Sequence, residues 1–275
     1  MNKPPKIVTR EDGTVMVERF SPIRRVEHTL AMVTFVVLVL TGFPQSLRGD
    51  VSLWIMNLFG GLDAMRRVHR IAGIVFCAHA GAHLLSIVIG IVTGRMRPTL
   101  LPTPQDLRDA WHNLLYYLGF RERGPELPKF DYRQKFEYIG LILGGMVMVF
   151  SGLILMFPMQ AAQLLPGQLI PAAAVAHSKE AVLALLVLVI WHVYSVTLSP
   201  EVFPLDRTIF SGYIDKEELK ERHTLEYRRI FGDEGLEEAI EEAVEKAPET
   251  SDEAKTSTDS ARNGSATQND PSGAI

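Results

Sequence analysis

The fold is decided by a stretch without charged residues, IAGIVFCAHAGAHLLSIVIGIVTG at residues 71–94. An α-helix needs about 20 mostly apolar residues to cross the hydrocarbon core of a bilayer, and this stretch is long enough. Charged residues are also absent from residues 29–47, 138–178 and 181–200. The chain therefore has enough apolar sequence for four membrane-spanning helices.

We predict an all-α integral membrane protein, a four-transmembrane-helix bundle whose membrane domain covers residues 23–200. The four spans are expected at about residues 28–47, 69–93, 137–158 and 177–198. The alternative is a soluble protein with buried helices, but buried helices of this length without a polar stripe are rare. The first span begins too far from the N-terminus for a signal peptide, and no small-residue cleavage site follows it.

Three hydrophilic segments flank or follow this domain: an N-terminal segment at residues 1–22, a juxtamembrane segment at 201–232 and an acidic tail at 233–275. The tail holds twelve acidic and three basic residues. It has almost no large apolar side chains and cannot bury enough surface to order itself, so we predict that it is disordered.

The distribution of Lys and Arg predicts the orientation of the chain. These residues are concentrated in the N-terminal segment, in the connection at 95–135 and in the juxtamembrane segment, whereas the connection at 159–176 has no charge. Because cytoplasmic loops carry an excess of Lys and Arg, both termini are expected in the cytoplasm. In a bacterium the two short connections would face the periplasm, and the protein would lie in the inner membrane.

Three shorter elements are also predicted. Residues 51–62 are apolar but too short to cross, and they are expected to lie in the membrane interface. Residues 8–20 place Asp12-Gly13 between β-forming residues, which is typical of a hairpin. A short helix is expected at residues 215–223.

Histidines within the spans are the candidate functional residues, because an ionisable side chain in hydrocarbon is costly. A single histidine is more often a neutral imidazole bonded to a neighbouring helix. His177 and His192, however, are separated by about 22 Å along a helix and about 60° around it. His69 and His83 are separated by about 21 Å and 40°. Each pair thus points to one side of its helix at two depths, whereas His79 fits that face less well.

The predicted topology places histidines of different spans at the same depth. His69 and His177 open the second and fourth spans at the non-cytoplasmic face, while His28 and His192 lie at the cytoplasmic face. Two imidazoles at each depth are what bis-histidine haem iron requires. Small residues beside the histidines fit a flat macrocycle or, equally, close helix packing. A faint repeat, with an offset of 110 residues, aligns Thr41-Gly42 with Ser151-Gly152.

These histidine contexts carry a resemblance to a known family. The sequence resembles the cytochrome b membrane subunits of respiratory formate dehydrogenases (gamma) and nickel-iron hydrogenases, the cytochrome b/b6-domain proteins, over about residues 18–231. The motifs that carry it are Arg24-Arg25-Val26-Glu27-His28, Leu40-Thr41-Gly42-Phe43-Pro44, His69-Arg70-Ile71-Ala72-Gly73, Asp131-Tyr132-Arg133-Gln134-Lys135-Phe136-Glu137-Tyr138 and Trp191-His192-Val193-Tyr194.

The resemblance implies two non-covalent b-type haems. His69 with His177 would hold the haem near the periplasm, and His28 with His192 the haem near the cytoplasm. His83 departs from the better-known pattern. It could replace His28 as a haem ligand, serve a quinone or bind a further haem.

The resemblance also implies a quinone site in the segment just before the third span, at Asp131, Arg133 and Gln134. A carboxylate and an amide at the membrane edge suit proton delivery to a quinone. The same residues could instead merely cap the third helix. Asp131 and Arg133 also differ from the residues of the better-known members.

The expected function is that of the membrane subunit of a respiratory oxidoreductase. It would carry electrons between a periplasmic iron-sulfur or multihaem subunit and menaquinone or ubiquinone in the lipid, with no nucleic acid as partner. The chain has no cysteine cluster and no nucleotide-binding glycine loop, so it cannot oxidise a primary donor alone. The alternatives are a non-catalytic membrane anchor with structural histidines and a histidine-lined metal transporter.

Overall fold

The computed structural model describes residues 5–96 and 98–232, and the chain divides into two units at residues 1–230 and 231–275. The predicted disordered tail lies outside the described residues. The first unit contains all the candidate site residues.

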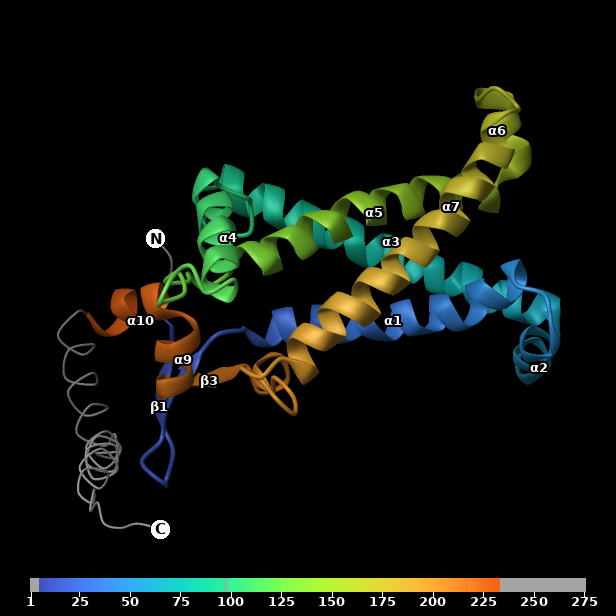
Figure 1. Cartoon of the computed structure of the whole chain (residues 1–275). Coiled ribbons are helices and arrows are strands. Elements are labelled where there is room, and N and C mark those ends of the chain that lie inside the picture. The colour runs from blue at the N-terminus through green and yellow to red at the C-terminus, as the bar shows by residue number, and fades with distance from the viewer. Residues whose placement is uncertain (1–4, 97, 233–275) are drawn as a thin grey trace, which may run out of the picture. The chain divides into compact units, whose positions relative to one another are not determined.

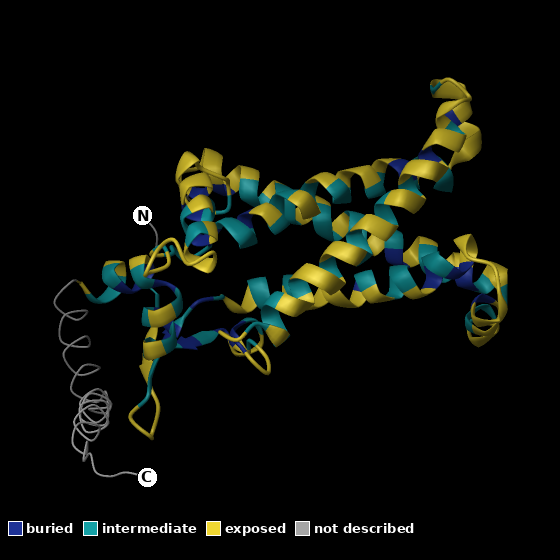
Figure 2. Cartoon of the chain, in the orientation of Figure 1, coloured by how far each residue is buried: buried dark blue, intermediate teal, exposed yellow. Residues whose placement is uncertain are grey.

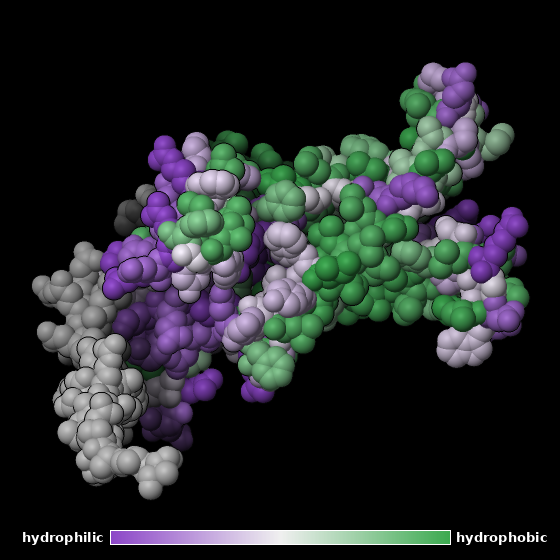
Figure 3. All heavy atoms as spheres, in the orientation of Figure 1, coloured by the Kyte–Doolittle hydropathy of each residue, from purple (hydrophilic) through white to green (hydrophobic). Residues whose placement is uncertain are grey.

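Four long helices form the membrane domain, which confirms the predicted all-α membrane fold. They are α1 (Pro22–Ser46), α3 (Leu62–Val92), α5 (Tyr132–Met156) and the continuous helix made of α7 (Leu169–Leu186) and the π-helical segment η1 (Val187–Leu198). All four are long and apolar enough to cross a membrane. Figure 3 shows their apolar side chains as a continuous band between two hydrophilic ends.

The apolar side chains of these helices point outward, as a lipid environment requires. Ile71 and Phe150, for example, are 63% and 65% exposed. In Figure 2 the four helices are almost entirely exposed or intermediate. Lipid tails are as apolar as these side chains, so outward-facing apolar residues are favourable here.

Each helix begins before the charge-free stretch that predicted it. In α1 and α3 charged residues lie in the first two turns, as with Arg24 and Arg25 in α1 and Arg66 and Arg67 in α3. Charge patterns report the hydrocarbon-spanning part of a helix, whereas the helix itself extends further into the interface. His28 and His69 therefore lie within their helices rather than at the first residue.

Local signals fix where three of the helices begin. Pro22 occupies the first turn of α1, and Asp131 caps α5 by accepting a hydrogen bond from the backbone N–H of Gln134. Thr103 and Asp106 form the corresponding capping box of α4 (Pro104–Tyr117). Such boxes satisfy backbone donors that the first helical turn leaves unpaired.

Two short helices form the end of the bundle opposite the sheet. These are α2 (Asp50–Leu58), between α1 and α3, and α6 (Pro158–Leu164), between α5 and α7 (Figure 1). The helix α2 corresponds to the segment predicted to lie in the membrane interface. Its Trp54 side chain is exposed.

A small module at the other end, here called the juxtamembrane module, contains the sheet. The strands β1 (Ile7–Thr9) and β2 (Val15–Glu18) form an antiparallel hairpin, and β2 also pairs with β3 (Tyr213–Asp215). The helices α8 (Thr208–Ser211), α9 (Lys216–Arg222) and α10 (Thr224–Phe231) complete it. The hairpin and the short helix α9 confirm two sequence predictions, whereas the third strand was not predicted.

Buried side chains hold this module together. Val17, Ile214, Leu219 and Tyr227 are at most 2% exposed and form a small apolar core. Arg19 donates to the carbonyl oxygen of Lys129 at 2.6 Å and lies 3.9 Å from Glu226. Burial lowers the pKa of Arg19 to about 10, although Glu226 opposes this shift.

These contacts join three distant parts of the chain. Arg19 follows the hairpin, Lys129 belongs to the connection between α3 and α5, and Glu226 lies in α10. The three basic segments therefore meet at the same end of the bundle. This arrangement is the one that the charge distribution predicted, and the compartment that this end faces stays a prediction.

Candidate functional site

His69 and His177 face each other between α3 and α7. Their ring centroids are 6.4 Å apart, and the rings are nearly perpendicular. Two imidazoles that ligate one metal ion from opposite sides, with each nitrogen about 2 Å from the metal, have ring centres about 6 Å apart. This pair, here called the outer pair, lies toward the end of the bundle that carries α2 and α6.

Hydroxyl groups fix the orientation of both outer histidines. The Thr41 hydroxyl donates to the backbone oxygen of Val37 at 2.6 Å, so its oxygen accepts the proton of His69 Nδ1 at 2.9 Å. Ser151 repeats this arrangement. It donates to Val147 O at 2.5 Å and accepts from His177 Nδ1 at 2.9 Å.

A histidine that donates from Nδ1 keeps the lone pair of Nε2 free for a metal. Metal-ligating histidines commonly donate their other ring nitrogen in this way, which fixes the tautomer and the ring orientation. The hydrogen bonds of Thr41 and Ser151 therefore prepare both outer imidazoles for ligation through Nε2.

Glycines allow the two outer imidazoles to pack against the neighbouring helices. A Cβ atom at Gly42 would lie 3.1 Å from Cε1 of His69, and one at Gly152 would lie 3.2 Å from Cε1 of His177. Both distances are tight, so a larger residue would press on the ring. Gly42 and Gly152 therefore serve the histidines directly, rather than only helix packing.

His28 and His192 form a second pair, here called the inner pair, between α1 and η1. Their ring centroids are 6.2 Å apart. The Glu137 carboxylate lies 3.3 Å from His192 Nδ1 and can accept its proton, which again leaves Nε2 free. The inner pair lies toward the juxtamembrane module, so the two pairs occupy the two depths predicted from the sequence.

The π-helical segment η1 carries His192, and this segment was not predicted from the sequence. A π-helix has more residues per turn than an α-helix, so it changes the direction of the side chains that follow. The angle of about 60° between His177 and His192, calculated for an α-helix, therefore does not apply across η1. π-Helical turns are frequent at functional sites.

His83 does not join either pair. Its Nε2 lies 3.2 Å from the Tyr138 hydroxyl, and its Nδ1 lies 3.1 Å from Arg24 and 3.4 Å from Glu27. His79 is one turn away on the same helix, with a ring-centroid distance of 6.4 Å. Two residues on one helix face cannot approach a metal from opposite sides, so this distance does not make them a pair.

Asp131, Arg133 and Gln134 lie together at the start of α5 and hydrogen-bond to one another. The Asp131 carboxylate accepts from Gln134 N at 3.0 Å and from two nitrogens of Arg133 at 2.9 and 2.8 Å. Asp131 is 3% exposed. These contacts correspond to the helix-capping role considered in the sequence analysis, and the quinone role of the segment stays a prediction.

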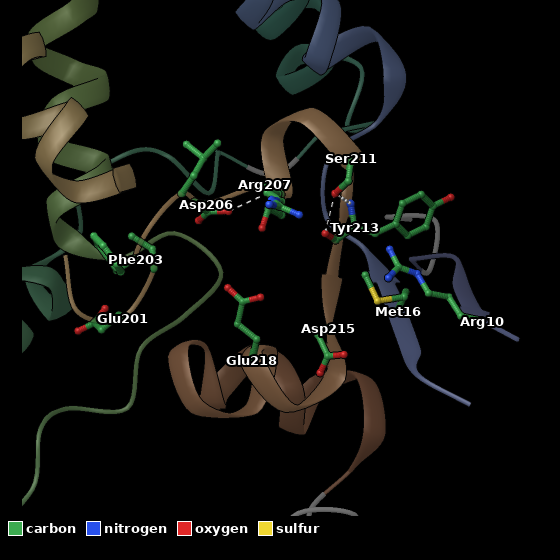
Figure 4. A pocket seen from close by; sticks show the side chains of 13 residues that line it. Arg10, Met16, Glu201, Phe203, Asp206, Arg207, Ser211, Tyr213, Asp215 and Glu218 are labelled. Atoms are coloured by element: carbon green, nitrogen blue, oxygen red, sulfur yellow. Dashed lines mark hydrogen bonds between the residues drawn. The ribbon is translucent and has the colours of Figure 1, made fainter. Parts of the chain in front are cut away.

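A pocket in the juxtamembrane module is separate from the histidines. Polar and charged side chains line it, among them Arg10, Asp206 and Glu218 (Figure 4). None of the residues that the sequence singled out as ligands or as a quinone site lines this pocket. The candidate site therefore lies outside this pocket, at the two histidine pairs between the membrane helices.

The polar partners of the histidines were not predicted from the sequence. Thr41 and Ser151 were recognised only as part of a faint repeat, and Glu137 only within a family motif. A hydroxyl residue at both corresponding positions was the signal that could have identified them. Their roles become visible only when the helices are placed side by side.

The residues present fit haem at both depths. Each pair offers two imidazoles from different helices at the separation that bis-histidine ligation requires, and acceptors hold three of the four Nδ1 atoms. Within residues 5–96 and 98–232 no group of three or more His, Cys, Asp or Glu side chains could hold a metal ion. Four apolar helices with paired imidazoles define a membrane cytochrome of the b type.

The chain belongs to the prokaryotic cytochrome b561 family, whose model matches residues 19–208. This match confirms the family resemblance seen in the sequence and identifies a membrane b-type cytochrome that acts in electron transfer. A b-type haem is therefore its cofactor. A comparison with curated proteins gave no match.

Proposed function

We propose that the chain is the two-haem membrane subunit of a respiratory oxidoreductase in the inner membrane of a bacterium. It transfers electrons across the membrane between a periplasmic redox subunit, iron-sulfur or multihaem, and menaquinone or ubiquinone. Both termini face the cytoplasm. The observation that carries this proposal is the presence of two facing histidine pairs at two depths of one bundle.

In this proposal His69 and His177 hold the outer haem, and His28 and His192 hold the inner haem. Haem supplies the one-electron chemistry. The protein residues orient the ligands: Thr41 and Ser151 hold the outer imidazoles, and the carboxylate of Glu137 holds His192. A carboxylate at Nδ1 makes an imidazole a stronger ligand, so the two haems would differ in their potentials.

The position of the hydrophilic ends supports the proposed direction of the chain in the membrane. The basic segments meet in the juxtamembrane module, and the short connections with α2 and α6 form the opposite end. A periplasmic electron partner would then bind beside the outer pair.

Haem content tests the proposal directly. A pyridine haemochrome assay on the purified chain, expressed with adequate haem supply, should give two b-type haems per polypeptide. His177→Ala should release one of them, whereas the matched control His79→Ala should release none. A wild-type protein without haem, or a His177→Ala variant with full haem content, would contradict the proposal.

A further inference from the structure

The two halves of the bundle repeat each other's polar contacts. In the first half Thr41 of α1 bonds His69 of α3, and in the second half Ser151 of α5 bonds His177 of α7, both at 2.9 Å. The flanking glycines repeat as well, because a Cβ atom added at Gly42 or Gly152 would lie 3.1 or 3.2 Å from the facing imidazole. The helix pair α1–α3 thus corresponds to the pair formed by α5 and α7–η1.

The same correspondence holds at the inner end. Glu137 of α5 lies 3.3 Å from Nδ1 of His192, and Glu27 of α1 lies 3.4 Å from Nδ1 of His83. His83 is therefore the counterpart of His192. Tyr138 follows Glu137 in the sequence as His28 follows Glu27, so Tyr138 is the counterpart of His28.

This repeat assigns a counterpart to the inner pair itself. His28 and His192 have ring centroids 6.2 Å apart, and Tyr138 and His83 have ring centroids 6.1 Å apart. The bundle thus contains a second position with the framework of the inner haem site. In this second position a tyrosine replaces one histidine.

The Tyr138–His83 position is not arranged for iron. Its two facing polar atoms, Tyr138 Oη and His83 Nε2, are 3.2 Å apart and share a hydrogen bond. An iron ion between them would need a separation of about 4 Å, because each bond to the metal is about 2 Å long. The other ring nitrogen of His83, Nδ1, faces Arg24 and Glu27 and not Tyr138.

The groups at this position suit a flat ring that carries carbonyl or hydroxyl oxygens. A phenol O–H, an imidazole and a guanidinium group can donate hydrogen bonds, and the same phenol and imidazole can accept them. A few polar groups placed in otherwise apolar surroundings are typical of sites for small ligands. Polar clusters within membrane spans are functional candidates by default.

The cluster is not fully buried. The side chains of His83, Glu27 and Arg24 are 25%, 24% and 30% exposed. A small molecule can therefore reach their polar atoms. Glu27 and His28 are consecutive residues, so this position lies next to the inner pair.

We propose that His83 and Tyr138, together with Arg24, form the binding site for the head group of a quinone or quinol beside the inner haem. This inference rests on the proposed function, because it requires that a quinone exchanges electrons at the inner end. It places the head group in the counterpart of the haem site rather than in the segment of Asp131, Arg133 and Gln134.

Equilibrium binding of quinones to the purified, haem-loaded full chain in lipid nanodiscs tests this site. The probes are decylubiquinone and menadione, and quenching of tryptophan fluorescence reports their Kd values. Tyr138→Phe and His83→Asn should each raise the Kd of the bound quinone about five- to tenfold, which is the effect of losing one hydrogen bond. Tyr194→Phe, which removes an exposed hydroxyl from η1, is the matched control and should bind as the wild type does.

A haemochrome assay on the same samples separates the alternatives. The expected result is two haems in the wild type and in every variant. Loss of a haem in His83→Asn would make His83 an iron ligand and overturn the inference. Unchanged Kd values in Tyr138→Phe and His83→Asn, with a raised Kd in Gln134→Ala, would move the site to the start of α5. A wild-type chain with two haems that binds neither quinone would refute the quinone part of the proposed function, and this inference with it.

Discussion

Removal of the charge on Glu137 should raise the midpoint potential of one haem. The Glu137 side chain is 18% exposed, and its carboxylate lies 3.3 Å from Nδ1 of His192. Ferric haem carries one more positive charge than ferrous haem, so a nearby carboxylate stabilises the ferric state. Glu137→Gln removes this stabilisation while it keeps the size of the side chain and a hydrogen-bonding oxygen.

The magnitude follows from the distance between the carboxylate and the iron. The imidazole ring and one metal–nitrogen bond of about 2 Å separate them by roughly 7 Å in total. Two unit charges at roughly 7 Å interact by about 2 kcal/mol at an effective dielectric constant of about 20. For a one-electron couple, in which about 59 mV corresponds to a tenfold change, this energy is a shift of about 90 mV.

Redox potentiometry of the purified chain, followed in the α-bands of the two haems, measures this shift. The matched variant is Ser151→Ala, which removes a neutral acceptor from His177 of the outer pair. Ser151→Ala should shift the midpoint potential of the other haem, and this shift should be smaller than the one that Glu137→Gln causes. Unchanged potentials of both haems in Glu137→Gln, or a fall in potential, would refute the assignment of His192 as a ligand supported by Glu137.

Four further changes test other parts of the structure. Thr41→Val should weaken retention of one haem about 10- to 100-fold, since it removes a hydrogen bond from behind a ligand, and haem transfer to apomyoglobin measures this. Lys135→Met should destabilise the end of the bundle that carries the juxtamembrane module by about 3–5 kcal/mol in a denaturation assay, because it leaves the Asp106 carboxylate, 10% exposed and 2.7 Å from the lysine, without its partner. His223→Asn should reduce the loss of stability below pH 6.5 by about 1.4 kcal/mol per pH unit, measured by limited proteolysis at decreasing pH. Tyr138→His should raise the haem content from two to three, measured by the haemochrome assay.

The sign of the pH effect follows from the burial of His223. Burial lowers the pKa of His223 to about 3, and repulsion from Arg19 and Arg222 acts in the same direction. A hydrogen bond to the backbone oxygen of Pro128 opposes this shift. In the unfolded chain the imidazole takes up a proton near pH 6.5. Between pH 3 and pH 6.5 the unfolded state binds more protons than the folded state does. The contribution of His223 to the free energy of unfolding is therefore fully present above pH 6.5 and decreases as the pH falls toward 3. If the juxtamembrane module of the wild-type chain resisted proteolysis equally at pH 4 and at pH 7, this account would be contradicted.

The Asp106–Lys135 pair shows how a buried charge is retained. Burial raises the pKa of Asp106, but hydrogen bonds from Lys135 and Thr103 outweigh this effect, so the pKa lies below its ordinary value. The pair joins α4 to the start of α5. Replacement of both residues by apolar ones should therefore restore much of the stability that Lys135→Met removes.

The sequence was sufficient for the parts of the fold that depend on local patterns. Absence of charge over residues 71–94 predicted α3, and Asp12-Gly13 predicted the hairpin of β1 and β2. The pairing of β2 with β3 was not predicted, because it joins segments separated by about 200 residues and has no local signature. The π-helical segment at Val187–Leu198 has an apolar sequence that is equally compatible with an α-helix.

The candidate site was predictable to the same extent. Topology and the family resemblance paired His69 with His177 and His28 with His192, and the structure brings both pairs together. Depth alone left His83 as an alternative to His28. Side-chain partners were not predictable, because the hydroxyl of Thr41 and the carboxylate of Glu137 reach histidines on other helices. Their contacts depend on helix rotation, which the hydrophobic pattern does not fix when all faces are apolar.

The repeat explains how one bundle can hold two different kinds of inner site. Each half contributes one histidine to the outer pair, so the repeat creates a single outer site shared by both halves. At the inner end each half contributes one residue from its first helix and one histidine from its second, so the repeat creates two equivalent positions. Only one of these positions has histidine on both sides, because Tyr138 stands where the other half has His28. The difference of one side chain is enough to close the second position to iron and to leave a partly exposed polar site beside the inner pair.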